Sequence, residues 1–175
     1  MSITIRRRPY IVGVMGGADA PAPLLEEAFL LGDGIARRGH VLLTGGGPGI
    51  MRAASEGAWR AGGLVIAVLP NDRLWPLDGY PNEYVDIPIY TGLSDARNVI
   101  NAKTPHLIVI LPGGAGTLSE LALALKAGTP VVTLRRDPPE FAPPGACVRA
   151  ETVAEVLAVM DDRLPPLGAV LTDGF

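Results

Sequence analysis

Short unbroken apolar runs alternate along the chain with stretches in which apolar residues recur at helical spacing. Continuous runs rich in β-branched residues are typical of strands in a parallel sheet that helices cover on both faces. Such runs predict strands at Tyr10–Met15, Val41–Thr44, Leu64–Leu69, His106–Leu111 and Pro130–Leu134, and a short strand within Tyr84–Ile89 despite Pro88. Glycine or proline follows most of these runs, so the strands are expected to end in sharp turns.

Helical spacing fills the intervals between the predicted strands. In the first interval Leu24, Leu31 and Ile35 share one face, although Gly32 and Gly34 locally disfavour a helix. Helices are predicted over Leu24–Arg38, Ile50–Ala61, Ser94–Lys103 with Ser94 as its N-cap, Leu118–Lys126, and the amphipathic stretch from Val153 to Met160. Strands that alternate with helices in this way predict an α/β fold, a doubly wound Rossmann-like domain with a mostly parallel sheet flanked by helices.

The length of the chain suits that architecture. The 175 residues are enough for one domain with a single core, so we expect one Rossmann-like nucleotide- or phosphate-binding domain over residues 1–175. Within it, residues 1–9 are expected to form a basic leader, 135–146 a loop and 162–175 a tail. The run Arg6–Arg8 and the apolar residues after it resemble an export leader only superficially, because the apolar part is short and ends in glycines.

Composition and charge exclude several classes of function. Apolar residues make up 48% of the chain, yet no window approaches the roughly 18 consecutive apolar residues of a membrane span. We therefore expect no membrane association and assign the apolar surplus to a homodimer or higher homo-oligomer. A net charge of −3 with mixed signs argues against a nucleic-acid partner. The single cysteine, Cys147, excludes an internal disulfide and a multi-cysteine metal site, and we expect a cytoplasmic protein.

Three of the predicted strands end in glycine clusters. In doubly wound sheets, ligands bind beyond the carboxyl ends of the strands, where the strand order reverses. A single cluster is adequately explained by a tight turn, but three together favour one shared crevice. Its candidate ligand-binding residues are Gly16 and Gly17 after the first strand, and Gly45, Gly46 and Gly47 in the cluster that runs to Gly49. The third cluster lies within Gly113–Gly116.

The stretch Leu111–Glu120 contains the clearest chemical signal. A strand runs into Pro112 and three glycines, and a helix follows, so the unpaired amides of its first turn and the positive end of its dipole face outward. Glycines leave room for an anion to approach those amides. The predicted phosphate-binding residues are Gly113, Gly114, Ala115, Gly116 and Thr117. No Lys-Ser/Thr pair follows the glycines, so the turn is not a Walker loop.

Glu120 and Arg97 are the ionisable residues most able to reach this crevice. Each has a structural alternative. The order Thr117-Leu-Ser-Glu120 matches a capping box, in which the carboxylate would turn back to the start of the helix. Arg97 could instead be a solvated arginine on a helix face, paired with Asp95 or another surface acid.

The remaining candidates are weaker. Trp75 lies in a polar loop and is interpreted as a loop anchor rather than a platform for a flat ring. Trp59 is expected in the core or at an interface. His40 and His106 have no second ligand at metal spacing, so no metal site is predicted. Neither a cysteine nucleophile nor a Ser-His-Asp arrangement is indicated.

The motif Pro112–Thr117 with Glu120, an arginine in the helix upstream, and the run Gly45–Met51 resemble the LONELY GUY (LOG) proteins. The likeness covers about Ile11 to Val132. It implies a LOG-like fold and, by analogy with the cytokinin riboside 5'-monophosphate phosphoribohydrolases, a catalytic pair at Arg97 and Glu120. The sequences of Ala96–Asn101 and Leu118–Pro130 are more similar to the branch of the superfamily that contains the molybdenum cofactor carrier proteins than to the hydrolases.

Two departures from the hydrolases bear on function. Those enzymes typically follow the motif arginine with lysine, whereas this chain has Asn98, which we include among the ligand-binding residues. They also carry a longer acidic, tryptophan-containing helix after the glycine motif, where this chain soon reaches Gly128. The catalytic pair that the resemblance implies is therefore retained in altered surroundings, and the predicted phosphate turn is intact.

The sequence thus supports two main hypotheses. In the first, which we favour, a non-catalytic pocket binds a phosphorylated heterocycle, the molybdenum cofactor or a nucleotide, and the protein requires no other cofactor. In the second, the protein hydrolyses a nucleoside 5'-monophosphate to free base and ribose 5-phosphate, with Glu120 assisting the bond cleavage and Arg97 clamping substrate. A nucleotide sensor that reports ligand state through its oligomer is a third possibility.

Overall fold

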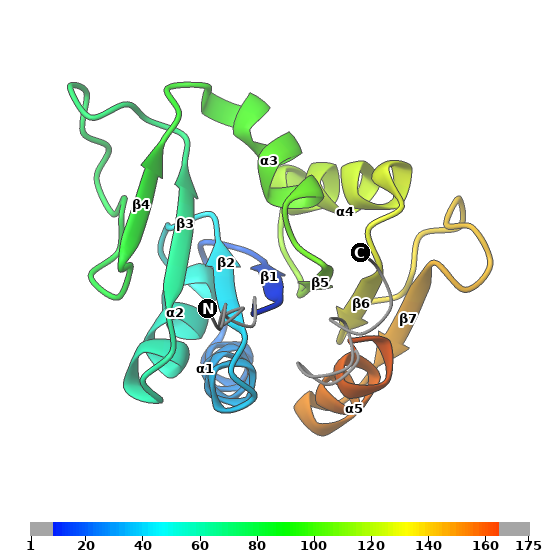
Figure 1. Ribbon diagram of the computed structural model, residues 1–175. Coiled ribbons are helices and arrows are strands. Elements are labelled where there is room, and N and C mark those ends of the chain that lie inside the picture. The colour runs from blue at the N-terminus through cyan, green and yellow to red at the C-terminus, as the bar shows by residue number, and fades with distance from the viewer. Residues whose placement is uncertain (1–8, 165–175) are drawn as a thin grey trace, which may run out of the picture.

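The computed structural model describes residues 9–164, which form a sheet with helices on both faces (Figure 1). In chain order, the first half comprises β1 (Ile11–Met15), α1 (Ala22–Arg37), β2 (Val41–Thr44), α2 (Ile50–Arg60), β3 (Val65–Leu69) and β4 (Ile87–Tyr90). The second half comprises the 3-10 turn η1 (Ser94–Arg97), α3 (Asn98–Lys103), β5 (Leu107–Ile110), α4 (Ala115–Ala127), β6 (Val131–Leu134), β7 (Cys147–Ala150) and α5 (Val153–Arg163).

The strand order confirms the predicted doubly wound α/β fold. The seven strands run in the order β4-β3-β2-β1-β5-β6-β7, and every neighbouring pair is parallel. The chain builds the sheet in one direction from β1 to β4 and then returns to add β5 on the other side of β1. The order therefore reverses between β1 and β5, and the carboxyl ends of these two strands form the expected ligand-binding position.

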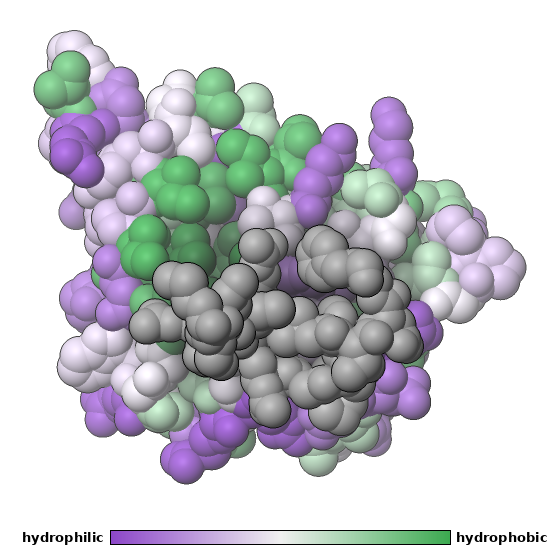
Figure 2. Space-filling model, in the orientation of Figure 1, coloured by the Kyte–Doolittle hydropathy of each residue, from purple (hydrophilic) through white to green (hydrophobic). Residues whose placement is uncertain are grey.

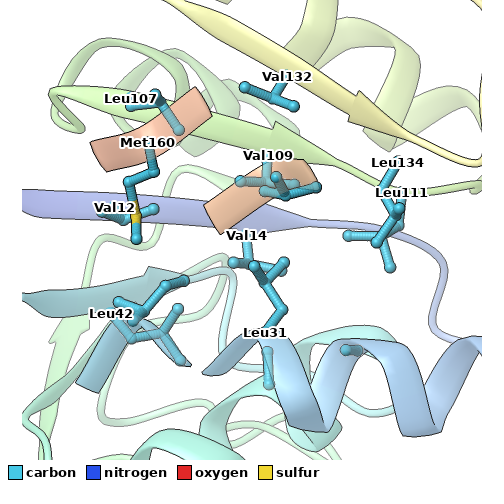
Figure 3. Close-up of a cluster of buried hydrophobic side chains, with 14 of the residues drawn as sticks. Val12, Val14, Leu31, Leu42, Leu107, Val109, Leu111, Val132, Leu134 and Met160 are labelled. Carbon is cyan, nitrogen blue, oxygen red and sulfur yellow. The ribbon is translucent and has the colours of Figure 1, made fainter. Parts of the chain in front are cut away.

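Each central strand contributes alternate side chains to two cores, one on each face of the sheet. Val12, Val14, Leu107 and Val109 point toward the layer of α1, α2 and α5, together with Met160 of α5 (Figure 3). The residues between them point to the opposite face and pack under α3 and α4. That second cluster includes Met15, Leu43, Ile108, Ile110, Leu121 and Ala124. Burial on both faces explains why these strands are continuous apolar runs.

Helices α1 and α2 approach each other more closely than ordinary side chains would allow. A Cβ atom on Gly32 would lie 2.0 Å from the carbonyl oxygen of Ala54, and one on Gly57 would lie 2.0 Å from that of Phe29. The glycine that weakens the helical pattern at position 32 is therefore a packing residue, because it lets the two backbones meet directly.

Several predicted boundaries differ from the structure. Helix α1 begins at Ala22 and α4 at Ala115, each earlier than the apolar spacing indicated. The predicted N-cap at Ser94 is wrong, since Ser94 lies inside η1 with a φ of 49° and Leu93 precedes the turn without a side-chain cap. Strand β7 was not predicted, because it follows a proline-rich loop and only Ala150 within it is buried. Residues 1–8 of the leader and 165–175 of the tail lie outside the described residues.

The two tryptophans are more exposed than predicted. Trp59 is 49% exposed on α2, so its placement in the core is wrong. Trp75 is 76% exposed in the loop after β3, where its backbone N–H donates to Asp72 Oδ1 while the ring stays in solvent. The loop is therefore held by its backbone and by Asp72, and Trp75 does not anchor it.

Apolar side chains are also exposed around α3 and at the β4 edge of the sheet. Figure 2 shows hydrophobic residues gathered in the upper part of the molecule, in the same view as Figure 1. The exposed apolar residues in this region include Ile87, Ile89, Leu93, Val99 and Leu118. A homo-oligomer remains a prediction. No helix within residues 9–164 has the length and apolar character needed to cross a bilayer.

Candidate functional site

A pocket opens where the strand order reverses. The backbone N–H of Gly17, just after β1, donates to the carbonyl oxygen of Pro112, just after β5, at 3.0 Å. This bond joins the two glycine turns at the floor of a cavity of about 230 Å³. The residues that line the cavity are Gly16, Gly17, Ala18, Met51, Tyr80, Asp95, Arg97, Asn98, Gly114, Gly116, Thr117 and Glu120. The structure thus brings together residues that lie up to about a hundred positions apart in the chain.

The first turn of α4 faces this pocket with its amides open. Gly114 is the N-cap, and no side chain caps the helix. The amides of the first turn have no intrahelical acceptor, and they carry the positive end of the helix dipole. A Cβ atom added to Gly114 would meet nothing within 4 Å, so space for an anion lies directly in front of the turn.

Gly113 and Thr117 brace the turn rather than leave it open. A Cβ atom on Gly113 would lie 2.3 Å from Thr117 Oγ1 and 2.7 Å from the Gly17 amide nitrogen. Only glycine fits at this position while the two turns remain in contact. Ala115 and Gly116 are exposed at the start of the helix, and Thr117 is buried.

Arg97 is buried at 8% exposure, so its interpretation as a solvated surface arginine is wrong. Its Nη1 donates to the carbonyl oxygens of Gly45 at 3.0 Å and Val68 at 2.7 Å, which joins the ends of β2 and β3. Its Nε is buried and has no acceptor among the described residues. A buried guanidinium N–H without a partner is costly, and this one belongs to a residue that lines the pocket.

Glu120 is 6% exposed and lines the same pocket. Its Oε1 accepts a hydrogen bond from Asn101 Nδ2 at 2.8 Å. Burial raises the pKa of the Glu120 carboxyl above its usual value, opposed by the Asn101 hydrogen bond and the positive charge of Arg97. The capping-box alternative is wrong, because Thr117 lies inside α4 and the carboxylate binds α3 rather than the start of its own helix.

Two asparagines of α3 hold the site against α4. Asn98 Nδ2 donates to Ser119 Oγ at 2.8 Å, and Ser119 Oγ donates in turn to the carbonyl oxygen of Gly116. Asn101 is fully buried, and its Oδ1 has no donor among the described residues. Asn101 was not among the predicted site residues. The available signal was the pair of amides three residues apart on one helix, which places them on the same face.

The second glycine cluster lies behind the pocket wall. Nη1 of Arg97 would be 2.3 Å from a Cβ atom on Gly45, and the Tyr80 ring would be 2.4 Å from one on Gly47. Gly46 has a φ of +77°, which side chains rarely adopt. These glycines are buried and do not line the cavity, but they let Arg97 and Tyr80 reach it.

The other polar candidates are outside the pocket. His106 Nδ1 accepts a hydrogen bond from the backbone of Ile11, and burial lowers the pKa of His40. Burial raises the pKa of the Cys147 thiol, which disfavours the thiolate. Among residues 9–164, no three His, Cys, Asp or Glu side chains gather closely enough to hold a metal ion.

Comparison with known families assigns the chain to a defined group. The model of the SLOG cluster4 family matches residues 9–160, which includes every residue of the pocket. The chain belongs to the SLOG cluster4 family. An uncharacterised protein of Archaeoglobus fulgidus is 39% identical over 124 residues, covering 71% of this chain and 79% of that protein.

Solved structures similar to this SLOG cluster4 protein include two molybdenum cofactor proteins. The molybdenum cofactor binding protein of Rippkaea orientalis is 36% identical with a TM-score of 0.80, covering 91% of this chain and 100% of that one. A molybdenum cofactor carrier protein of Chlamydomonas reinhardtii is 42% identical with a TM-score of 0.78, covering 90% and 98%. The neighbours confirm the predicted LOG-like fold near the carrier branch.

A hydrolase is also related to this SLOG cluster4 protein. The cytokinin riboside 5'-monophosphate phosphoribohydrolase of Mycobacterium tuberculosis is 35% identical over 101 residues. The match covers 57% of this chain but only 53% of the hydrolase, so about half of that enzyme's length has no counterpart in the comparison.

Proposed function

We propose that the protein binds a phosphorylated heterocycle, the molybdenum cofactor or a nucleotide, with the phosphate on the first turn of α4. The observation that carries this proposal is the meeting of open helix amides and a buried guanidinium at one pocket. The uncapped amides of Gly114–Thr117 favour an anion, and the buried Arg97 that lines the same cavity has an Nε without an acceptor among residues 9–164. Gly113, Ala115 and Gly116 complete the phosphate turn, and Gly16 and Gly17 form its floor.

Met51 and Tyr80 in the pocket lining suit a flat ring, and the volume of the pocket limits how much of a ligand it can enclose. Ligand pockets usually span roughly 300–1,000 Å³. The cavity here is about 230 Å³ and carries Met51 and Tyr80 on its wall, which suit the flat face of a heterocycle. The similar proteins of Rippkaea and Chlamydomonas are named for the molybdenum cofactor, a phosphorylated pterin.

The environment of Glu120 favours binding over hydrolysis. A carboxylate that stabilises an oxocarbenium-like transition state should be ionised and face the substrate. Burial instead raises the pKa of Glu120, and Asn101 occupies its Oε1. These features favour a carboxyl that shapes the pocket.

Isothermal titration calorimetry with GMP and AMP tests the phosphate turn. Gly114→Asp places a negative charge in the open space, and we expect at least a tenfold loss of affinity for both nucleotides. Gly114→Ala is the matched control, because its methyl group meets no atom within 4 Å and adds no charge. Equal binding by the Asp and Ala variants would refute the proposal, as would failure of the wild-type protein to bind GMP, AMP or the molybdenum cofactor. Fluorescence titration with the molybdenum cofactor extends the test to that ligand.

Hydrolysis is the second candidate function, because Arg97 and Glu120 do line one pocket and a raised carboxyl pKa favours a role as general acid. Incubation with AMP and isopentenyladenosine monophosphate, followed by chromatography, would detect released base. Under this hypothesis Glu120→Ala lowers turnover by roughly a hundredfold or more. No free base from the wild-type protein would discard it.

We also propose that the protein acts as a homodimer or higher homo-oligomer in the cytoplasm. The exposed apolar residues around α3 and α4, including Val99 and Leu118, support the oligomer. Sedimentation of the full chain, with and without GMP, measures its mass and tests whether ligand binding alters assembly. A monomer at all concentrations would refute the oligomer, and a nucleotide-dependent mass would favour a sensor.

A further inference from the structure

The pocket has two chemically different ends. Gly114, Gly116 and Thr117 line the β5 side, where the helix amides favour an anion. Met51 and Tyr80 line the side next to β2, where the Tyr80 ring packs against Gly47. A ligand with its phosphate on α4 therefore extends its ring toward Met51 and Tyr80. This assignment rests on the phosphate site proposed above.

Asp95 of η1 also lines this pocket and is solvent-exposed. Among residues 9–164, its carboxylate takes part in no ion pair or side-chain hydrogen bond, unlike the paired carboxylates of Glu27, Asp33 and Asp161. Arg97 follows two positions later but directs Nη1 to backbone carbonyls. Asp95 is thus an unpaired acceptor on the wall of a pocket that also contains the anion-favouring first turn of α4.

A ligand phosphate cannot pair with the Asp95 carboxylate, because both groups are negatively charged and repel each other. An ionised carboxylate has only acceptors, so a ligand group that meets it must present hydrogen-bond donors. Two donors side by side on a planar ring match the two oxygens of a carboxylate, and charge-assisted bonds of this kind are stronger than neutral ones.

We propose that Asp95 selects rings that carry a 2-amino-4-oxopyrimidine edge, as guanine and pterins do. That edge presents a ring N–H beside an exocyclic amino group, and both donate to the carboxylate. The corresponding edge of adenine places a ring nitrogen lone pair against the carboxylate, which repels it. The pocket therefore discriminates against adenine-type ligands, which include the cytokinin nucleotides that the mycobacterial hydrolase is named for.

Calorimetric titration of the full chain with GMP, IMP and AMP isolates the contribution of the ring, since the three share the ribose 5-phosphate. A bidentate pair of this kind discriminates by roughly tenfold or more. We expect GMP to bind about tenfold more tightly than AMP, with IMP, which lacks the amino group, between them. A phosphorylated pterin, 6-hydroxymethylpterin phosphate, forms the second arm and separates a pterin site from a guanine site.

Asp95→Asn is the decisive variant. We expect it to weaken GMP binding about tenfold while AMP binding stays equal or improves, because the repulsion disappears. Asp78→Asn is the matched control, since Asp78 is exposed and does not line the pocket. Thermal unfolding of both variants checks that the fold is unchanged.

The outcomes distinguish this inference from the proposed function. Equal affinity of the wild-type protein for GMP and AMP overturns the inference but leaves the phosphate site standing. Equal weakening of GMP and AMP by Asp95→Asn also overturns it, because Asp95 would then bind the ribose hydroxyls that the two ligands share. Absence of binding by all four ligands refutes the proposed function itself.

Discussion

Replacement of Arg97 by methionine should destabilise the fold, whether or not Arg97 contacts a ligand. The guanidinium joins the ends of two neighbouring strands through the carbonyl oxygens of Gly45 and Val68, at 3.0 and 2.7 Å. Methionine is of similar length and apolar, so Arg97→Met removes both hydrogen bonds without opening a large cavity.

The expected loss follows from these two bonds. A hydrogen bond to a charged group contributes about 1.5–3 kcal/mol, so two contribute about 3–6 kcal/mol. Part of this loss is offset, because burial of a charged guanidinium with an unpaired Nε is unfavourable and Arg97, which is 8% exposed, no longer carries that cost when it is methionine. We expect a net loss of about 3 kcal/mol in the free energy of unfolding. For a chain of this size that lowers Tm by roughly 6–12 °C.

Differential scanning calorimetry or circular dichroism at neutral pH measures this shift. Lys103→Met removes one positive charge from an exposed position of α3 and should change Tm little. An unchanged Tm for Arg97→Met would show that the two backbone contacts contribute little to stability and that the arginine serves the ligand. If Tm falls as expected, loss of binding in an Arg97 variant is not evidence of direct contact with the ligand.

Two further variants test the packing of the helices and the buried carboxyl. Gly32→Ala should lower the free energy of unfolding by about 1–3 kcal/mol, measured by chemical denaturation, because its Cβ would lie 2.0 Å from the Ala54 carbonyl oxygen. Gly34→Ala is the control and should be milder, because its Cβ meets only the Leu157 side chain. A Gly32→Ala protein as stable as wild type would contradict the close approach of the two helices. Glu120→Gln should be more stable than wild type at neutral pH. The raised pKa of Glu120 means that the folded protein favours the protonated carboxyl. As the pH rises from the pKa of an ordinary glutamate through the raised pKa, ionisation of Glu120 therefore lowers the free energy of unfolding. Thermal unfolding from pH 4 to pH 8 should show the two proteins converging at the acidic end, and a constant difference would reject this account.

The strands and the glycine turn before α4 were predictable because their signals are local. A strand buried on both faces must be a continuous apolar run, as in Val41–Thr44, and a strand that turns at once into a helix needs small residues such as Gly113 and Gly114. The motif within Pro112–Glu120 is likewise contiguous, so the sequence by itself identified the fold class, the family resemblance and the position of the turn. Strand β7 lacked this signal because it lies at the edge of the sheet and is mostly not buried.

Only the tertiary structure decided what the individual polar residues do. Arg97 was expected to clamp substrate or lie in solvent, but it reaches carbonyls 52 and 29 positions away. Glu120 matched a capping box, yet its partner is Asn101, 19 positions away on another helix. Hydrogen bonds over such separations leave no periodic trace in a sequence. They arise when the reversal of strand order brings separate strand ends and helices to one edge of the sheet, and this is why the pocket could be placed from the sequence while its contacts could not.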